Sequence, residues 1–172
     1  MELDIKSLPQ GPSEAALVAE ARTLDVDGPE ITFEGQVQAR LRVVRHDDNV
    51  LVQGVGEGRI RGECARCLEP CNQPLAAEFT VYAERRPEGG VRGLDRELEA
   101  DRYLCFHDGV RLELGEAVRE ALLLALPLRL LCRPECKGLC AGCGANLNLE
   151  PCTCAERTAP PAAGSENPKR RT

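Results

Sequence analysis

The sequence predicts an α+β fold, in which an antiparallel β-sheet is packed by one main helix and followed by a cysteine-rich C-terminal lobe. Three observations support this prediction: apolar and polar residues alternate over residues 31–64, an apolar stripe of helical spacing runs over residues 113–126, and six cysteines crowd residues 132–154. Only 3% of the 172 residues are aromatic. The aliphatic core is therefore modest, and we expect one domain with appendages.

Two long strands joined by a tight turn form the first predicted pair of elements. Over residues 31–43 the inward set is Ile31, Phe33, Val37, Ala39, Leu41 and Val43, and the outward set is Thr32, Glu34, Gln36, Gln38, Arg40 and Arg42. After the turn residues 46–49, small or apolar residues return at even positions from Val50 to Cys64. This loop length pairs Arg45 with Val50, and the same register pairs Phe33 with Gly62. Inward positions then meet inward positions, which favours an antiparallel hairpin.

The third strand and the main helix follow from the same periodicity arguments. Residues 75–83 place Leu75, Ala77, Phe79, Val81 and Ala83 on one face. Residues 113–126 place apolar side chains three and four apart, with Glu113 and Glu116 near the start and Pro127 ending the helix. We expect this helix to cover the apolar face of the sheet. Residues 85–102, with two adjacent glycines and mixed charges, are expected to form a mobile loop.

The chain divides at these elements. The N-terminal segment is ambiguous, with a short helix over Ser13 to Ala21 as one interpretation. The last residues end in a basic run and lack the apolar content for a core. The predicted parts are an N-terminal segment (1–30), an α+β core (31–130), a cysteine-rich lobe (131–154) and a disordered tail (155–172).

Glycines at positions 54, 56 and 58 invite comparison with phosphate-binding loops. No helix is predicted after them, and they lie inside the hairpin register, so a nucleotide site is disfavoured. We interpret them as strand glycines that allow a bend or close packing by the helix.

The cysteines predict metal binding. In Cys140-Ala141-Gly142-Cys143-Gly144 two thiolates lie three residues apart around a turn, and the glycines let backbone N–H groups face the sulfurs, as in a zinc knuckle. Four thiolates complete a tetrahedral and purely structural zinc site. We therefore expect a zinc-stapled lobe.

The chain has 10 cysteines, and the economical partition is two zinc sites with two spare thiols. One predicted site contains Cys140, Cys143, Cys152 and Cys154, and the other contains Cys64, Cys67, Cys132 and Cys136, which leaves Cys71 and Cys105 unassigned. Spacing alone does not identify the partners. A rival arrangement pools Cys132, Cys136, Cys140 and Cys143 in one site.

The start of the chain bears on whether the cysteines form disulfides. The first 25 residues carry charges throughout and no continuous apolar stretch, so we expect neither a signal peptide nor a membrane anchor. A cytoplasmic location follows as an expectation. In a reducing compartment clustered cysteines persist as metal ligands or catalytic thiols more often than as disulfides.

Outward-facing arginines are the predicted contacts for a partner or nucleic acid: Arg40, Arg42, Arg59, Arg61 and Arg66. The hairpin register also sets Glu34 opposite Arg61, and Gln38 opposite Glu57, so ordinary cross-strand pairing on a solvated face explains much of this strip. Arg66 differs because it lies between two predicted ligands at an exposed turn.

No catalytic constellation is visible, and we expect no enzyme. His46 lies beside two aspartates in a turn, His107 follows Cys105 closely, and neither belongs to a nucleophile arrangement. The pair in Cys64-Ala65-Arg66-Cys67 is a candidate redox motif. Such a motif needs a helix after it, whereas here a new strand begins near Leu75, so a metal knuckle is favoured.

Three motifs in the same order resemble the bacterial YceD family: Cys-Ala-Arg-Cys-Leu-Glu-Pro at 64–70, Leu-Ala-Leu-Pro at 124–127, and CKGLCAGCGANLN with a later C-x-C pair at 136–154. The resemblance covers residues 1–154 and implies a role in accumulation of large-subunit (23S) ribosomal RNA. Family members commonly have proline where this chain has Ala141, and some lack the C-terminal cysteines. This difference implies that the second site stabilises a lobe, whereas Cys64, Arg66 and Cys67 lie nearer the shared role.

We therefore expect a non-enzymatic factor of large ribosomal subunit biogenesis that binds a large-subunit ribosomal RNA precursor or a basic ribosomal protein. The net charge of −6 favours the protein partner. No membrane and no small-molecule substrate are expected. Two other classes stay open: a thiol-redox or zinc-release sensor, which a low-pKa thiolate in the zinc-loaded protein would indicate, and a zinc-stapled adaptor unrelated to ribosomes.

Overall fold

The computed structural model describes residues 1–28, 30–85, 103–152 and 154. Within these residues the fold is mostly β-sheet with two helices. A five-stranded sheet has the order β2-β3-β4-β5-β6, and β1 pairs with β7 in a separate two-stranded sheet. The strands are β1 (Glu2–Asp4), β2 (Gly11–Glu20), β3 (Ile31–His46), β4 (Asn49–Glu63), β5 (Pro70–Arg85), β6 (Tyr103–His107) and β7 (Arg111–Glu113), and the helices are α1 (Ala21–Leu24) and α2 (Gly115–Leu124).

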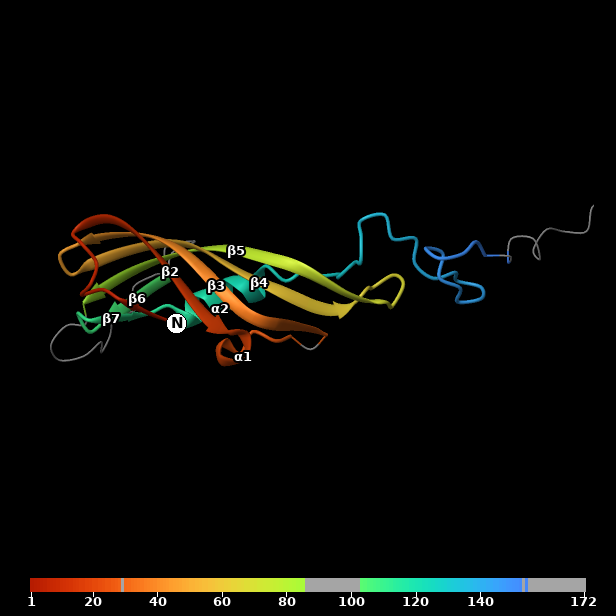
Figure 1. Cartoon of the computed structure of the whole chain (residues 1–172), viewed down its shortest axis with the longest axis horizontal. Coiled ribbons are helices and arrows are strands. Elements are labelled where there is room, and N and C mark those ends of the chain that lie inside the picture. The colour runs from red at the N-terminus through yellow and green to blue at the C-terminus, as the bar shows by residue number, and fades with distance from the viewer. Residues whose placement is uncertain (29, 86–102, 153, 155–172) are drawn as a thin grey trace, which may run out of the picture.

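The molecule is elongated, and its cysteine-rich segment lies at one end (Figure 1). The long strands β3, β4 and β5 run along the molecule, with α2 against one face of the sheet. The turn between β4 and β5 points toward the cysteine-rich end, whereas the turn between β3 and β4 lies at the opposite end. Among the described residues, no helix has the length and apolar character needed to cross a membrane.

The β3–β4 hairpin has the predicted register from the turn as far as Gln38. Arg45 pairs with Val50, Val43 with Val52 and Gln38 with Glu57. Beyond Gln38 the predicted register is wrong, because Phe33 lies opposite Ile60 rather than Gly62, and Glu34 lies opposite Arg59 rather than Arg61.

A bulge between Glu34 and Gln38 causes this shift. Four steps along β3 correspond to two steps along β4, from Arg59 to Glu57, and Gly35 within the bulge has a φ of 70°. Glycine adopts this left-handed conformation without the penalty that a Cβ brings. Because the excess is two residues, Phe33 and Val37 both stay on the buried face.

The N-terminal segment is a strand where a short helix was one interpretation. Residues 13–20 belong to β2, which pairs antiparallel with β3 from Gly11↔Arg45 to Glu20↔Gln36, and helix α1 begins only at Ala21. Burial alternates along β2, so its small apolar side chains add to the sheet's inner face. Arg45 also donates to the carbonyl oxygens of Ile5 and Leu8, at 2.9 and 3.2 Å, which fastens the segment to the sheet.

Strand β5 contains the predicted strand at residues 75–83 and extends it in both directions. It pairs antiparallel with β4 but parallel with β6, so the expectation of a purely antiparallel sheet is wrong at this edge. A tight turn would force antiparallel pairing, whereas a long connection permits the parallel arrangement. The predicted mobile loop at 85–102 lies, apart from Arg85 in β5, outside the described residues, as does the predicted disordered tail.

Glycines of β4 let neighbouring side chains pack directly on the sheet. A Cβ on Gly56 would lie 3.3 Å from Cγ1 of Val118, which places α2 against the backbone there. A Cβ on Gly54 would lie 2.5 Å from Cζ of Phe79, and one on Gly58 would lie 3.1 Å from Cδ1 of Phe33. The predicted close packing by the helix is confirmed at Gly56, whereas Gly54 and Gly58 are packed by side chains of the neighbouring strands.

Candidate metal centres

The first cluster of thiols lies at the end of the β4–β5 hairpin. Cys64 and Cys67 come from the turn between these strands, and Cys132 and Cys136 come from the segment after α2. All four Sγ atoms lie within 4.8 Å of one another, with distances of 3.7 Å between Cys64 and Cys136 and 3.7 Å between Cys67 and Cys132. Three of the four are buried, and we call this cluster centre 1.

Backbone hydrogen bonds shape both halves of centre 1. The N–H of Cys64 donates to the carbonyl oxygen of Glu69 at 2.9 Å, and the N–H of Leu68 donates to that of Cys64 at 2.9 Å. Leu68 has a φ of 60°, so the turn after the first cysteine pair is tight. The N–H of Ala65 donates to the carbonyl oxygen of Leu130 at 2.8 Å, which docks the later segment beside the turn.

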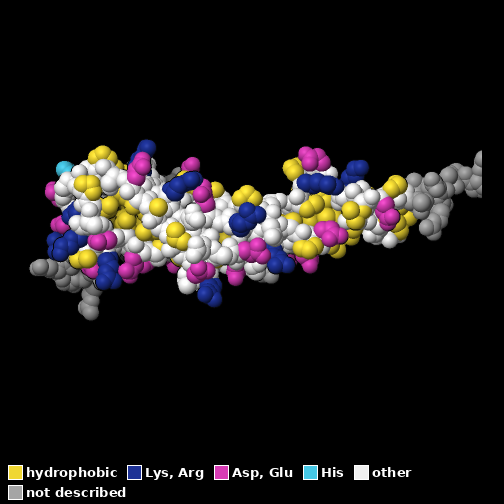
Figure 2. Space-filling view, viewed as in Figure 1, with side chains coloured by type: hydrophobic (Ala, Val, Ile, Leu, Met, Phe, Trp, Pro, Cys, Tyr) yellow, Lys and Arg dark blue, Asp and Glu magenta, His cyan; other side chains and the backbone are white. Residues whose placement is uncertain are grey.

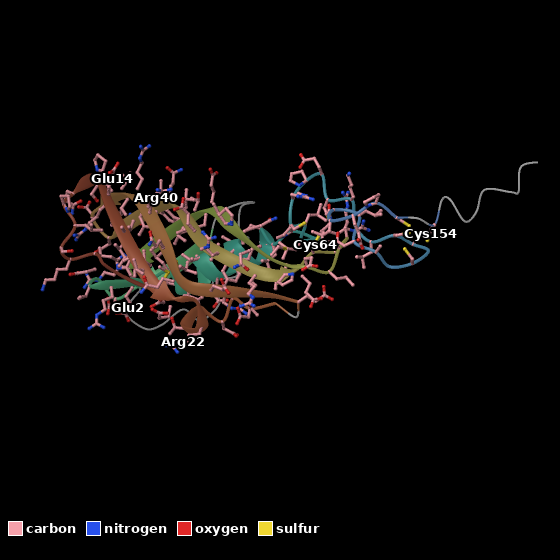
Figure 3. All side chains as sticks on the ribbon, turned by 45° about the vertical axis from the view of Figure 1, so that its right-hand side comes forward. Glu2, Glu14, Arg22, Arg40, Cys64 and Cys154 are labelled. Carbon is pink, nitrogen blue, oxygen red and sulfur yellow. The ribbon has the colours of Figure 1, made fainter. Side chains whose placement is uncertain are left out.

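The second cluster lies farther from the sheet and contains Cys140, Cys143, Cys152 and Cys154, which we call centre 2 (Figure 3). Its four Sγ atoms also lie within 4.8 Å of one another, with 3.1 Å between Cys140 and Cys152 and 3.4 Å between Cys143 and Cys152. The N–H of Gly142 faces the Sγ of Cys140 at 3.4 Å. Gly144, at a φ of 76°, closes the turn by donating to the carbonyl oxygen of Cys140 at 2.9 Å.

Both clusters fit a tetrahedral metal ion. Zinc–sulfur bonds of about 2.3 Å place the sulfurs of a regular tetrahedron about 3.8 Å apart. The 3.7 Å distances in centre 1 match this separation, whereas the 3.1 and 3.4 Å distances in centre 2 are shorter and would lengthen by about half an ångström on metal binding. Four thiol donors suit zinc and leave no position for a reacting water. Each cluster could therefore hold a metal ion in a structural role.

Both centres contain thiols whose pKa is lowered, namely Cys64 and Cys136 in centre 1 and Cys140 in centre 2. The backbone N–H of Cys132 favours the thiolate of Cys64 and lowers its pKa to about 6. The Sγ of Cys152 and the amides of the knuckle lower the pKa of Cys140 to about 6. Burial raises the pKa of Cys132 to about 12, so metal binding must displace its proton.

The structure groups the cysteines as the sequence analysis predicted, and the pooled arrangement of Cys132, Cys136, Cys140 and Cys143 is not the one found. No disulfide joins any of the ten cysteines, all of which lie in the described part of the chain. Cys71 packs beside centre 1 without joining it. Cys105 lies on β6 at the other end of the sheet, and burial raises its pKa to about 11.

Arg66 is exposed, as expected, but its side chain is engaged within centre 1. Its guanidinium donates to the carbonyl oxygen of Cys136 at 2.9 Å and to that of Pro134 at 3.4 Å. Its own carbonyl oxygen accepts from the N–H of Leu139 at 3.0 Å. Arg66 therefore joins the two halves of the centre, a role that sequence reasoning missed because the contacts cross about seventy residues of chain.

Comparison with known proteins identifies the family. The family model described as large ribosomal RNA subunit accumulation protein YceD matches residues 52–164, a region that contains both centres. The chain belongs to the YceD family. No solved structure matches it significantly.

Plant and mycobacterial relatives agree with this assignment. A chloroplastic large ribosomal RNA subunit accumulation protein YCED homolog 1 of Zea mays is 29% identical over 67% of this chain and 47% of the relative. The Arabidopsis thaliana protein of the same name is 24% identical over 69% of this chain and 43% of the relative. An uncharacterized protein of Mycobacterium tuberculosis is 34% identical over 64% of this chain and 51% of the relative. This chain thus matches about half the length of these relatives.

Two of the four sheet arginines in the predicted strip of this YceD chain form ion pairs. Arg40 forms an ion pair with Glu57, and Arg61 forms one with Glu34 at 3.3 Å. Arg42 and Arg59 form no ion pair within the described residues. The solvated-face interpretation thus accounts for half of the strip, and contact between these arginines and a partner stays a prediction.

Neither histidine joins a reactive group in the described part of the chain. His107 is buried, where the N–H of Gly109 donates to its Nδ1 at 3.0 Å and its Nε2 lies 2.8 Å from the carbonyl oxygen of Asp48. An accepting Nδ1 leaves the proton on Nε2, which donates to Asp48. His107 therefore holds β6 against the β3–β4 turn.

Leucines beside centre 1 are the surface feature that sequence reasoning missed. A groove of about 1080 Å³ lies between the β4–β5 turn and the chain that leaves α2. Leu68, Leu124 and Leu128 line it and are 59%, 80% and 104% exposed. Figure 2 shows hydrophobic side chains at the cysteine-rich end, with charged side chains beside them. The available signal was the leucine-rich run around Pro127, which exceeds what one buried helix face needs.

Proposed function

We propose that this chain is a non-enzymatic factor that supports accumulation of large-subunit ribosomal RNA by holding a basic ribosomal protein during assembly. Membership of the YceD family is the observation that carries the ribosomal part of this proposal. The proposal places the protein in the cytoplasm, where it would act without a membrane or a small-molecule substrate. Two structural zinc ions, one in each centre, would hold the end of the molecule that binds the partner.

The exposed leucines favour a protein over an RNA as the direct partner. Large apolar patches on a soluble surface mark protein interaction sites, and leucine side chains offer nothing to a phosphate backbone. The groove formed by Leu68, Leu124 and Leu128 would take apolar side chains of the partner. The chain's net charge of −6 would attract a basic protein and repel RNA.

Direct binding of the ribosomal RNA precursor is the second candidate, and Arg42 with Arg59 is the observation that favours it. Both side chains lie on the outward face of the sheet and form no ion pair within the described ranges, so they are available for phosphates. Arg66 would add to this contact only at the expense of its bonds within centre 1.

Crosslinking in cells separates these candidates. We expect Leu124→Glu with Leu128→Glu to abolish the crosslink to a large-subunit protein, because charges in the groove oppose apolar docking. Val18→Glu with Val44→Glu is the matched control, since these valines are also exposed, at 55% and 39%, but lie on β2 and β3 away from the groove.

The opposite pattern would move the contact to the sheet. If Arg42→Glu with Arg59→Glu removes crosslinks to RNA while the leucine variant binds as wild type, the RNA candidate replaces the protein candidate. Measurable disulfide exchange by the zinc-loaded protein, with no ribosomal crosslink, would favour the thiol-redox class instead.

A further inference from the structure

The side chain of Asn148 connects the two metal centres. By sequence it belongs to the loop of centre 2, between Cys143 and Cys152. In space its Nδ2 donates to the Sγ of Cys136, a ligand of centre 1, at 3.3 Å. A group that belongs to one centre thus contacts a ligand of the other.

The orientation of this amide is determined by its partners. Its Oδ1 accepts from the backbone N–H of Lys137 at 2.9 Å and from the guanidinium of Arg133 at 2.9 Å. Its Nδ2 also donates to Oδ1 of Asn146 at 2.9 Å, and that oxygen accepts from the backbone N–H of Asn148 at 3.0 Å. A flipped amide would point N–H groups at two donors, so only one orientation satisfies the network.

The surrounding backbone carries the loop to this position. Leu139 and Asn146 form an isolated antiparallel bridge, and the N–H of Leu147 donates to the carbonyl oxygen of Gly138 at 2.9 Å. The loop of centre 2 therefore folds back along the segment that leads out of centre 1. Metal in centre 2 would hold both ends of this loop, at Cys143 and Cys152.

We propose that Asn148 couples the two centres, so that metal in centre 2 slows the loss of metal from centre 1. A donor to a ligating sulfur stabilises the thiolate and orients it. A metal ion in centre 2 orders the loop in advance, so that placing the amide against Cys136 loses less conformational entropy. In terms of equilibrium metal affinity this coupling is reciprocal, so metal in centre 1 equally favours metal in centre 2. The inference rests on the proposed metal centres.

Release of zinc to a chromogenic chelator from the full-length, zinc-loaded chain tests the coupling. Removing a partner of a metal ligand weakens metal affinity by about 10- to 100-fold. We expect Asn148→Ala and Asn148→Asp to speed release from centre 1 within this range. Asn148→Asp keeps the acceptor for Lys137 and Arg133 and loses the Nδ2 donor to Cys136 and Asn146, so it tests the contact even if Asn148→Ala misfolds. Asn49→Ala, which removes a partner of Tyr82 at the opposite end of the sheet, is the control.

A double-mutant cycle separates coupling from simple loss of a bond. Cys143→Ser with Cys152→Ser disables centre 2 and should speed release from centre 1 when Asn148 is present. In the Asn148→Ala background the same pair should add little, because the link is already broken. The coupling would be overturned if the cysteine pair speeds zinc release from centre 1 equally with and without Asn148. It would also be overturned if the Asn148 variants release zinc at the same rate as Asn49→Ala. A wild-type chain that binds no zinc would instead overturn the centres themselves.

Discussion

Among single residues, Arg66 combines surface exposure with a structural task. Its guanidinium bonds the carbonyl oxygens of Pro134 and Cys136, so it ties the second cysteine pair of centre 1 to the first. A tetrathiolate zinc site carries two negative charges, which a neighbouring cation helps to balance. Arg66 therefore acts on the stability of the centre before it acts on any partner.

We predict that Arg66→Glu speeds zinc release from centre 1 by about tenfold or more, because it removes two donors and adds a carboxylate beside the thiolates. Release to a chromogenic chelator measures the effect. Arg59→Glu is the control, since Arg59 is also exposed and forms no ion pair in the described part of the chain. Equal release rates for the two variants would show that the Arg66 contacts do not help to retain zinc in centre 1.

Thiol reactivity gives a second prediction at this scale, with a defined pH dependence. Burial raises the pKa of Cys105 to about 11, so at pH 7.5 only about one molecule in three thousand carries the reactive thiolate. We expect iodoacetamide to modify Cys105 slowly, with a rate that rises about tenfold per pH unit until the pH approaches 11. Peptide mass spectrometry of the zinc-loaded protein measures this rate, and rapid labelling at neutral pH would contradict it.

Removing the metal should reverse the order of reactivity. Once zinc has left and residues 131–152 have unfolded, Cys64 and Cys140 lose the hydrogen bonds that lower their pKa, yet the pKa of each stays well below that of the buried Cys105. They should therefore react first in chelator-treated protein and be protected when zinc is bound. Labelling of Cys64 at the same rate with and without zinc would argue against its role as a ligand.

At the scale of elements, the strands with clear alternation could be predicted from sequence, and their irregularities could not. The bulge at Gly35 adds two residues to β3, so the alternation of buried and exposed residues continues unbroken. The sequence therefore does not indicate the change of register. Residues 13–20 are small and apolar enough to suit a helix or a strand, and pairing with β3 decides between them. The parallel position of β6 depends on the path between distant segments, which local periodicity does not report.

The cysteine groups were predictable because the cysteines occur in closely spaced pairs, and two such pairs complete a four-thiolate site. The turn between two strands carries Cys64 and Cys67, and the segment after the helix carries Cys132 and Cys136. Arg66 and Asn148 were not assigned to the centres, because their contacts depend on how these segments cross. The spacing of residues along the sequence does not indicate side-chain hydrogen bonds to distant backbone carbonyls or sulfurs.

The glycines of β4 yield a prediction on packing. In a strand, alanine is ordinarily favoured over glycine, because glycine loses more conformational freedom on folding. Gly54→Ala should nevertheless destabilise the fold by about 1–3 kcal/mol, since its Cβ would lie 2.5 Å from the buried ring of Phe79.

Thermal unfolding of zinc-loaded protein measures this loss. Gly28→Ala is the matched control, because its Cβ would meet nothing closer than 3.6 Å, and its melting temperature should stay near that of the wild type. The zinc content of both variants should be unchanged. A Gly54→Ala variant as stable as the Gly28→Ala control would mean that the ring moves aside freely.

At the scale of the whole molecule, two separate clusters hold the chain together. The sheet, α1 and α2 share one apolar core, whereas Cys64, Cys67 and Cys136 form a second cluster with Leu131 and Leu139. Few large side chains stabilise the second cluster, so a metal ion bound there would supply most of its folding free energy. The two parts should therefore respond differently to metal removal.

We predict about two zinc ions per chain, and that chelation unfolds residues 131–152 while the sheet stays folded. Limited proteolysis with and without chelator, followed by mass spectrometry, would locate the cleavage sites. Cuts confined to the cysteine-rich segment are expected, with strand signals in circular dichroism retained. Purified protein without zinc, or loss of the sheet together with the lobe, would contradict this account of the architecture.

The most direct test of the proposed function is the ratio of large-subunit to small-subunit ribosomal RNA, measured across a density gradient in a strain that lacks this gene. We predict a lowered ratio with precursor large particles, restored by the wild-type chain and by Val18→Glu with Val44→Glu. Leu124→Glu with Leu128→Glu, at equal abundance, should fail to restore it. An unchanged ratio in the strain without the gene would contradict the role in large-subunit accumulation.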